Sequence, residues 1–281
     1  MPTFTVSVTP DYNRGECALW KDILYGSDKQ YFWYADPNMR TCLDFNQGGA
    51  MVDLRPYVAR IPQQTGIGTD NVYDASYPYL IQINYRAGYF THYAGAGTIK
   101  SCRVSYHGQS ADLCLCRTMA KYEKFDGGVR LVANPVTVTL DGLDIVIRST
   151  FTFEEGSGRV VTKREILNDL HGEEVTFEEY FTGAFGTTEY QADMTKLILG
   201  VGDETINFTY HGKKIEKRSK KEALTAYVVI PDVMTKVEMG GKADAYKVEE
   251  GIAFSPVYHL SLTKTLSKGA VETWLKLAKA N

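Results

Sequence analysis

The sequence lacks the features that mark several large classes of protein. No stretch reaches the roughly 18–20 consecutive apolar residues of a membrane-spanning helix. The start, MPTFTVSVTPDYNRGE, has no basic segment followed by an apolar run, so it does not read as a secretory signal. Basic residues are not in excess, because 31 Lys and Arg stand against 34 Asp and Glu. We therefore expect neither a membrane partner nor a nucleic-acid partner, and we interpret the basic run at 213–221 as a solvated loop or an edge strand.

Cysteine and cofactor motifs are equally sparse. The five cysteines are odd in number, irregularly spaced and without a CxxC pair, which argues against a disulfide framework and a zinc site. CLC at 114–116 would place two thiols on one face of a strand. Paired-histidine motifs, calcium loops, phosphate loops and GxSxG are all absent. The sequence thus predicts no metal, no cofactor and a cytoplasmic protein with reduced thiols.

Helical periodicity is scarce, and alternation of apolar with polar residues runs through most of the chain. TFTVSVTP, YFWYAD, IKSCRVSY, VTVTL and LDIVIRSTFTF all alternate with period two, as strands with one buried face do. Only GECALWKDILYG at 15–26 suggests a short helix. Asp141-Gly142 marks a hairpin, EEGSG at 154–158 joins two further strands, and YHGKK at 210–214 and MGGKAD at 239–244 resemble two more hairpin turns.

No Pro- or Ser-rich linker and no internal repeat divides the chain. We therefore predict an all-β fold: one large antiparallel β-sandwich spanning 1–281, with few or no helices. It would hold roughly fifteen to twenty strands in two packed sheets, and the strands of residues 1–40 would pack on it.

One strand carries an anomaly. In EEVTFEEYFTG, the apolar residues Val175, Phe177 and Phe181 share a face, and Glu179 falls on that same face. A buried carboxylate must be neutral, paired or lining a wet cavity. Glu179 is therefore a candidate base in a sugar site, a buried partner of Arg148 or Arg164, or a residue exposed by a β-bulge.

Three patterns resemble the galactose mutarotase-like β-supersandwich of aldose epimerases. They are LDFNQGGAMVDLRPY at 43–57, VTFEEYFTG at 175–183 and the closing YHLSLTKTLSKGAVETWLKL. The second is similar to the strand that carries the epimerases' catalytic histidine, and that position falls on Glu178 or Glu179 here. The resemblance implies a supersandwich that acts on sugars. The glutamate at the histidine position removes the imidazole that mutarotation uses.

The segment 82–97, QINYRAGYFTHYAGAG, supplies the other candidate residues for chemistry. It ends in an aromatic, glycine-rich loop, and aromatic rings stack on sugar faces while histidine transfers protons near neutral pH. We predict His92 as acid or base, Glu179 as its partner and Tyr93 as a proton donor to a leaving oxygen. The predicted substrate-binding residues are Arg60, Arg86, Arg148, Asn84 and His259.

Three functions remain open at this stage. The first is an acid–base isomerase or carbon–oxygen lyase that acts on a small carbohydrate or glycoside in a concave sheet face. The second is a non-catalytic sugar-binding or assembly subunit, and the third is a lipocalin-like small-molecule enzyme or carrier. The 19 tyrosines suit a ligand face and a homodimer interface alike.

Overall fold

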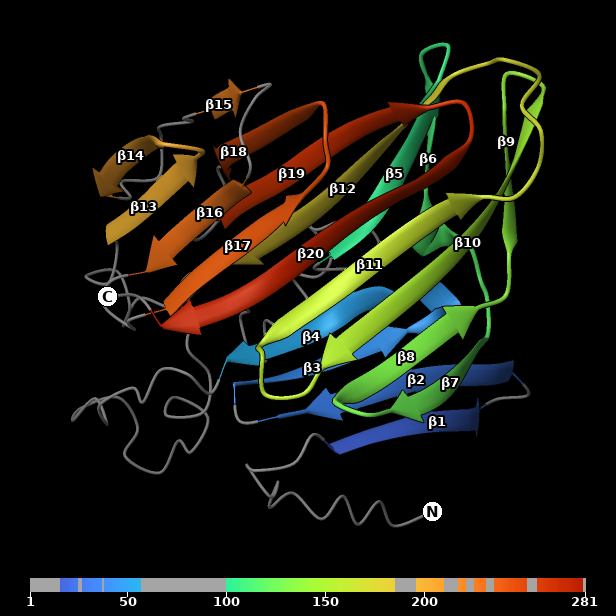
Figure 1. Cartoon of the computed structure of the whole chain (residues 1–281), viewed down its shortest axis with the longest axis horizontal. Helices are drawn as coiled ribbons and strands as arrows, with labels where there is room; N and C mark the ends of the chain where they lie inside the picture. Colours follow the sequence, from blue (N-terminus) through green and yellow to red (C-terminus); the bar gives the residue numbers. More distant parts are fainter. Residues whose placement is uncertain are drawn as a thin grey trace.

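The computed structural model describes residues 16–24, 27–36, 38–56, 100–184, 196–209, 217–220, 225–230, 235–251 and 257–279. These residues form twenty strands and two short 3-10 helices. No helix among them is long and apolar enough to cross a membrane. The strands divide into two ten-stranded antiparallel sheets, which lie one behind the other in Figure 1. The all-β, two-sheet prediction is confirmed.

The first sheet, here sheet A, has the order β1-β2-β3-β4-β5-β12-β19-β18-β15, with β6 paired to β5. Its strands are β1 (Glu16–Leu24), β2 (Ser27–Ala35), β3 (Met39–Asp44), β4 (Ala50–Pro56), β5 (Lys100–Tyr106), β6 (Gln109–Asp112), β12 (Val175–Ala184), β15 (Lys217–Lys220), β18 (Ala245–Gly251) and β19 (Val257–Leu266). The part of the basic run that is described, β15, is an edge strand, as expected.

The second sheet, sheet B, has the order β14-β13-β16-β17-β20-β11-β10-β8-β7, with β9 paired to β10. Its strands are β7 (Ala120–Phe125), β8 (Gly128–Ala133), β9 (Val136–Leu140), β10 (Leu143–Glu154), β11 (Arg159–Ile166), β13 (Lys196–Val201), β14 (Glu204–Thr209), β16 (Thr225–Ile230), β17 (Thr235–Gly241) and β20 (Gly269–Lys279). In the described part each sheet ends in two edge strands, so neither closes into a lipocalin-like barrel.

Three local expectations are corrected. The segment expected as a helix at 15–26 is strand β1, which pairs with β2 from Glu16 opposite Ala35 to Leu24 opposite Ser27. Of the CLC segment, Cys114 and Leu115 lie in the 3-10 helix Leu113–Leu115 and Cys116 follows it as the C-cap, while Asp112 caps the start and accepts the Cys114 N–H. MGGKAD is not a hairpin turn, since β17 and β18 on either side of it belong to different sheets.

The Asp141-Gly142 and EEGSG turn signals are confirmed, whereas YHGKK at 210–214 lies outside the described residues. Asp141 and Gly142 both have positive φ and join β9 to β10. The glycine pair of LDFNQGGAMVDL follows the 3-10 helix Phe45–Gln47, and Gly48 has φ +64°. A Cβ at Gly48 would lie 2.0 Å from the carbonyl oxygen of Leu113, so only glycine lets this turn pack against the second 3-10 helix.

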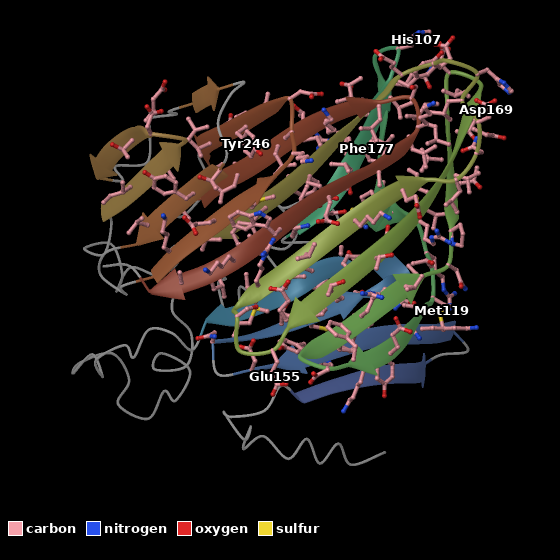
Figure 2. The ribbon with its side chains drawn as sticks, in the orientation of Figure 1. His107, Met119, Glu155, Asp169, Phe177 and Tyr246 are labelled. Carbon is pink, nitrogen blue, oxygen red and sulfur yellow. The ribbon has the colours of Figure 1, made fainter. Side chains whose placement is uncertain are left out.

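The core lies between the sheets and has two apolar clusters. One is built around Phe32, Phe151 and Phe181, and the other around Val104, Ile147 and Phe177. A set of buried polar residues is also enclosed by the sheets: Lys100, Ser149, Thr162, Arg164, Glu179 and Thr273. Figure 2 shows Phe177 on β12 and, at one end of the molecule, the exposed turn residues His107 and Asp169.

Candidate functional site

Strand β12 runs through the middle of sheet A, between β5 and β19. Its odd-numbered residues Val175, Phe177, Glu179 and Phe181 are fully buried and face sheet B. Its even-numbered residues are only partly buried and face outward. Consecutive residues of one strand therefore build two polar groups on opposite faces of sheet A.

The inner group, here called the ionic cluster, consists of Lys100, Glu179 and Arg164 with the hydroxyls of Thr162 and Ser149. Lys100 Nζ lies 2.7 Å from Glu179 Oε2, and Arg164 Nε lies 2.7 Å from Oε1. Lys100 also donates to Thr162 Oγ1 at 3.2 Å, and Arg164 donates to Ser149 Oγ at 2.6 Å. Each of the three charged side chains is at most 4% exposed.

Electrostatics keep this cluster ionised. Burial alone would raise the pKa of Glu179, but the charges of Arg164 and Lys100 and their hydrogen bonds outweigh it and lower the pKa to about 2. Burial works against the charge of Arg164 as well, and Glu179 offsets it, so that the pKa of Arg164 rises. Burial also raises the pKa of the neighbouring Cys102 thiol well above its usual value. Glu179 and Arg164 therefore act as fixed charges near neutral pH, while the Cys102 thiol stays neutral.

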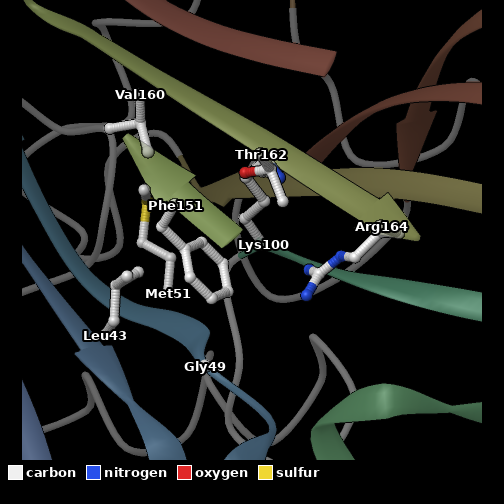
Figure 3. Close-up of a pocket in the computed structure, with 8 residues that line it drawn as sticks. All are labelled: Leu43, Gly49, Met51, Lys100, Phe151, Val160, Thr162 and Arg164. Carbon is white, nitrogen blue, oxygen red and sulfur yellow. Dashed lines mark hydrogen bonds between the residues drawn. The ribbon is translucent and has the colours of Figure 1, made fainter. Parts of the chain in front are cut away.

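A narrow space adjoins the ionic cluster and is lined by Leu43, Gly49, Met51, Lys100, Phe151, Val160, Thr162 and Arg164. Figure 3 shows Lys100 and Thr162 meeting there, with Arg164 projecting from β11. The space is too narrow to admit a water molecule. Glu179 is thus shut off from solvent in the described structure, and its contacts match the expectation of a buried partner in Arg164.

The outer group, here called the outer polar face, is a row of mostly half-buried side chains on β5, β6, β12, β19 and β18, in which Ser101 and Ser261 are buried. Cross-strand register places Glu178 opposite Arg103 and Thr263, and Tyr180 opposite Ser101 and Ser261. The members used below are Ser101, Arg103, Asp112, Glu178, Tyr180, Thr182, Lys247, Glu249 and His259.

Glu178 is 22% exposed and lies between two cations of this face. Arg103 Nη1 lies 3.3 Å from Glu178 Oε2, and Lys247 Nζ lies 3.7 Å from Oε1. Lys247 also lies 3.4 Å from Glu249. The carboxylate is therefore an acceptor that is already held in place by charge, which suits the binding of hydroxyl groups.

Two polar groups follow Glu178 along the same strand. The Tyr180 hydroxyl donates to Asp112 Oδ2 at 2.7 Å, and Ser101 Oγ donates to Asp112 Oδ1 at 2.9 Å. Beyond Tyr180, Thr182 Oγ1 lies 2.9 Å from His259 Nδ1. Burial lowers the pKa of His259, and the charge of Glu249 partly opposes this, so the imidazole tends towards its neutral form. The face thus offers phenol, hydroxyl, imidazole and carboxylate groups within one patch.

The predicted site residues are distributed unevenly. His259 lies on the outer polar face, Glu179 lies in the ionic cluster, and Arg148 lies on the outer face of sheet B, where its Nε is 3.2 Å from Glu165 Oε2. His92, Tyr93, Arg60, Arg86 and Asn84 lie outside the described residues. Sequence reasoning missed Arg103, Asp112, Tyr180 and Lys247. Only the alternation of β12, which puts Tyr180 on the face of Glu178, carried a signal for them.

Metal binding finds no support in the described ranges. They contain no group of three or more His, Cys, Asp or Glu side chains arranged to hold an ion. The exposed turn pair His107 and Asp141, whose Nδ1 and Oδ2 lie 2.9 Å apart, has no such third ligand.

The fold defined by these two sheets is similar to that of solved galactose mutarotase-like proteins. A galactose mutarotase-like protein from Clostridium acetobutylicum superposes with a TM-score of 0.55 at 7% identity, over 95% of this chain and 99% of that one. An α-N-acetylgalactosaminidase from Bifidobacterium bifidum gives 0.52 at 9% identity, over 96% of this chain but 36% of that enzyme.

A 4-α-glucanotransferase from Thermococcus litoralis gives a TM-score of 0.51 at 12% identity, and this chain spans 39% of its length. No protein-family model and no curated protein sequence matches the chain. Identities this low establish the shared fold and leave the activity open.

Proposed function

We propose that this chain binds a carbohydrate on the outer polar face of sheet A. The observation that carries the proposal is the row centred on Glu178 and Tyr180, in which charged and hydroxyl side chains from four neighbouring strands meet on the central strand β12. Sugar hydroxyls are recognised by such mixed donors and acceptors held in place by their neighbours. Solved proteins of the same fold include a galactose mutarotase-like protein, an α-N-acetylgalactosaminidase and a 4-α-glucanotransferase. The names of all three refer to sugars.

Binding without mutarotation is the form of the proposal that we favour. The resemblance places the epimerases' catalytic histidine at Glu178 or Glu179, of which Glu178 faces outward, and its carboxylate is paired with Arg103 and Lys247. Each oxygen of this carboxylate lies beside one cation, so the group is held in place as a hydrogen-bond acceptor for sugar hydroxyls. Glu179 cannot take over that role from inside the sandwich, since it is fully buried.

A second function, an acid–base isomerase or lyase, is favoured by one observation. The hydroxyl of Tyr180 donates its single proton to Asp112 at 2.7 Å, an arrangement in which the carboxylate could take up that proton while the phenol oxygen accepts one from a substrate. The predicted members of such a site remain His92, Tyr93, Arg60, Arg86 and Asn84. A homodimer and a cytoplasmic location also remain predictions.

Calorimetric titration with D-galactose, D-glucose and D-glucuronate tests the proposal, alongside polarimetry for mutarotation. We expect the wild-type chain to bind at least one of these sugars, with affinity reduced about tenfold in Tyr180→Phe and in Glu178→Gln. Arg130→Gln is the matched control, because Arg130 forms an ion pair with Glu123 on the other sheet. Equal loss in all three variants would contradict the assignment to this face, and catalysed mutarotation would favour the second function.

A further inference from the structure

We propose that the ionic cluster is a register key: Glu179, Lys100 and Arg164 are positioning residues that align β5 and β12 so that the outer polar face is assembled. The expected effect on sugar binding rests on the proposed function, whereas the alignment of the strands rests on the geometry of the sandwich interior. Among the described residues their hydrogen bonds and ion pairs stay within the cluster, so they act on the outer polar face chiefly through the strands that carry them.

Apolar packing alone leaves the register of β12 underdetermined. On its inner face, Val175, Phe177 and Phe181 recur every second or fourth residue, and β5 presents Cys102 and Val104 to the same core. A slip of one residue would turn every apolar side chain outward and is excluded by burial. A slip of two residues would keep the faces and exchange one apolar side chain for another, so that hydrophobic contacts discriminate against it only weakly.

The ionic cluster distinguishes these registers because its side chains connect both β12 and β5 to β11 in the opposite sheet. Glu179 of β12 meets Arg164 of β11 at 2.7 Å, and Lys100 of β5 meets Thr162 of β11 at 3.2 Å. Lys100 and Glu179 then close the triangle at 2.7 Å. A two-residue slip of either strand displaces it by roughly 6–7 Å, which leaves a buried charge without its partner.

The outer polar face depends on that register residue by residue. In β5, Ser101 of the outer polar face directly follows Lys100 of the ionic cluster. In β12, Tyr180 of the outer polar face directly follows Glu179 of the ionic cluster. In the observed register Tyr180 stands opposite Ser101, and both hydroxyls donate to Asp112. Displacement of either strand by two residues would separate the Tyr180 hydroxyl from Asp112 and Glu178 from Arg103.

The role we infer is specificity of alignment and not net stability. Two buried cations share one carboxylate, and the cost of removing three charges from water offsets much of their attraction. Buried ion pairs can often be replaced by apolar residues of similar volume without loss of stability. A single buried polar residue that fixes the register of a coiled coil is the best-known parallel.

The test replaces the three charges together. In the variant Lys100→Met/Arg164→Met/Glu179→Leu we expect a folded sandwich whose melting temperature stays close to that of the wild type. We expect its amides in β5 and β12 to exchange with deuterium at least tenfold faster, because alternative strand registers compete. We also expect a loss of affinity of about tenfold or more for the sugar that the wild type binds, whether D-galactose, D-glucose or D-glucuronate. Wild-type exchange and wild-type affinity in the folded triple variant would overturn the proposal.

A milder variant keeps the test decisive if the triple variant does not fold. Thr162→Val removes only the anchor of Lys100 on β11 and preserves the volume. We expect faster exchange in β5 than in β10 and a reduction of two- to threefold in sugar affinity, with Thr139→Val on the exposed strand β9 as control. Unchanged exchange in β5 would again overturn the proposal. If the wild type binds no sugar, the proposed function fails, whereas hydrogen exchange still decides whether the cluster sets the register.

Discussion

Glu178 and Glu179 are neighbours in the chain and the same residue type, yet they occupy opposite environments. Glu179 is fully buried between the sheets, where it meets one lysine and one arginine. Glu178 also meets one arginine and one lysine, but on the outer face of sheet A, where it is 22% exposed. The two carboxylates thus have the same kind of partners and differ chiefly in their access to water.

That difference decides what each carboxylate can do. Buried charges interact strongly because little solvent screens them, and breaking such a pair leaves an uncompensated charge. Half-exposed pairs of the outer face exchange partners at little cost, so incoming hydroxyl groups can compete for Glu178. Stability effects should therefore concentrate on one side of β12 and ligand effects on the other.

The largest contrast is expected from neutralising each carboxylate in turn. Glu179→Gln leaves Lys100 and Arg164 buried together without a counter-charge, and we expect it to lower the free energy of unfolding by about 3–5 kcal/mol. Glu178→Gln should change it by about 1 kcal/mol or less. Urea denaturation of the two variants measures both values, and similar losses would contradict the two-environment interpretation.

The sequence anticipated this contrast only in part. Alternation in VTFEEYFTG showed that Glu179 shares a face with apolar residues, and Arg164 was one of its expected partners. Lys100 could not be foreseen, because it comes from a strand that lies 79 residues earlier in the chain and meets Glu179 only through the strand order of sheet A. Periodicity assigns a residue to a face, but it does not reveal which strand is the neighbour.

The outer polar face shows the same limit. Arg103, Asp112 and Lys247 come from β5, β6 and β18, which local patterns cannot place beside β12. The helix expected at 15–26 failed for a related reason. Its weak helical pattern was overridden by pairing with β2, whose YFWYA segment supplies a strongly strand-forming partner.

The next largest effect is expected at low pH, where the stabilisation that Glu179 provides should be lost. The pKa of Glu179 is lowered from 4.5 to about 2 in the folded chain, so the unfolded chain binds the proton more readily. The stabilisation is complete above about pH 4.5 and is lost as the pH falls through about 2, with a total of roughly 3 kcal/mol. Unfolding free energies measured from pH 5 to pH 2 should fall less steeply in Glu179→Gln, and an unchanged slope would contradict the low pKa.

A smaller effect is expected at the perimeter of the ionic cluster. Ser149→Ala removes the acceptor of one Arg164 N–H inside the core, and we expect a loss of about 1–3 kcal/mol. Ser101→Ala removes a hydroxyl that donates to Asp112 on the outer side, where Asp112 keeps the Tyr180 hydroxyl, and about 1 kcal/mol or less should be lost. Thermal denaturation of both variants gives the order, and a larger loss in Ser101→Ala would reverse the comparison.

The smallest expected effect belongs to His259, the one histidine of the outer polar face. Burial lowers its pKa from 6.5, while Glu249 and Glu178 raise it and Lys247 lowers it further. Below about pH 6.5 the unfolded chain takes up a proton that the folded chain resists, so stability is full above that pH and declines as the pH falls towards the folded pKa. This window lies above that of Glu179, so the two can be separated. The decline between pH 6.5 and 5 should flatten in His259→Gln and persist in His171→Asn, whose side chain is exposed on a turn, and an equal slope in all three chains would show that the imidazole of His259 titrates as it does in water.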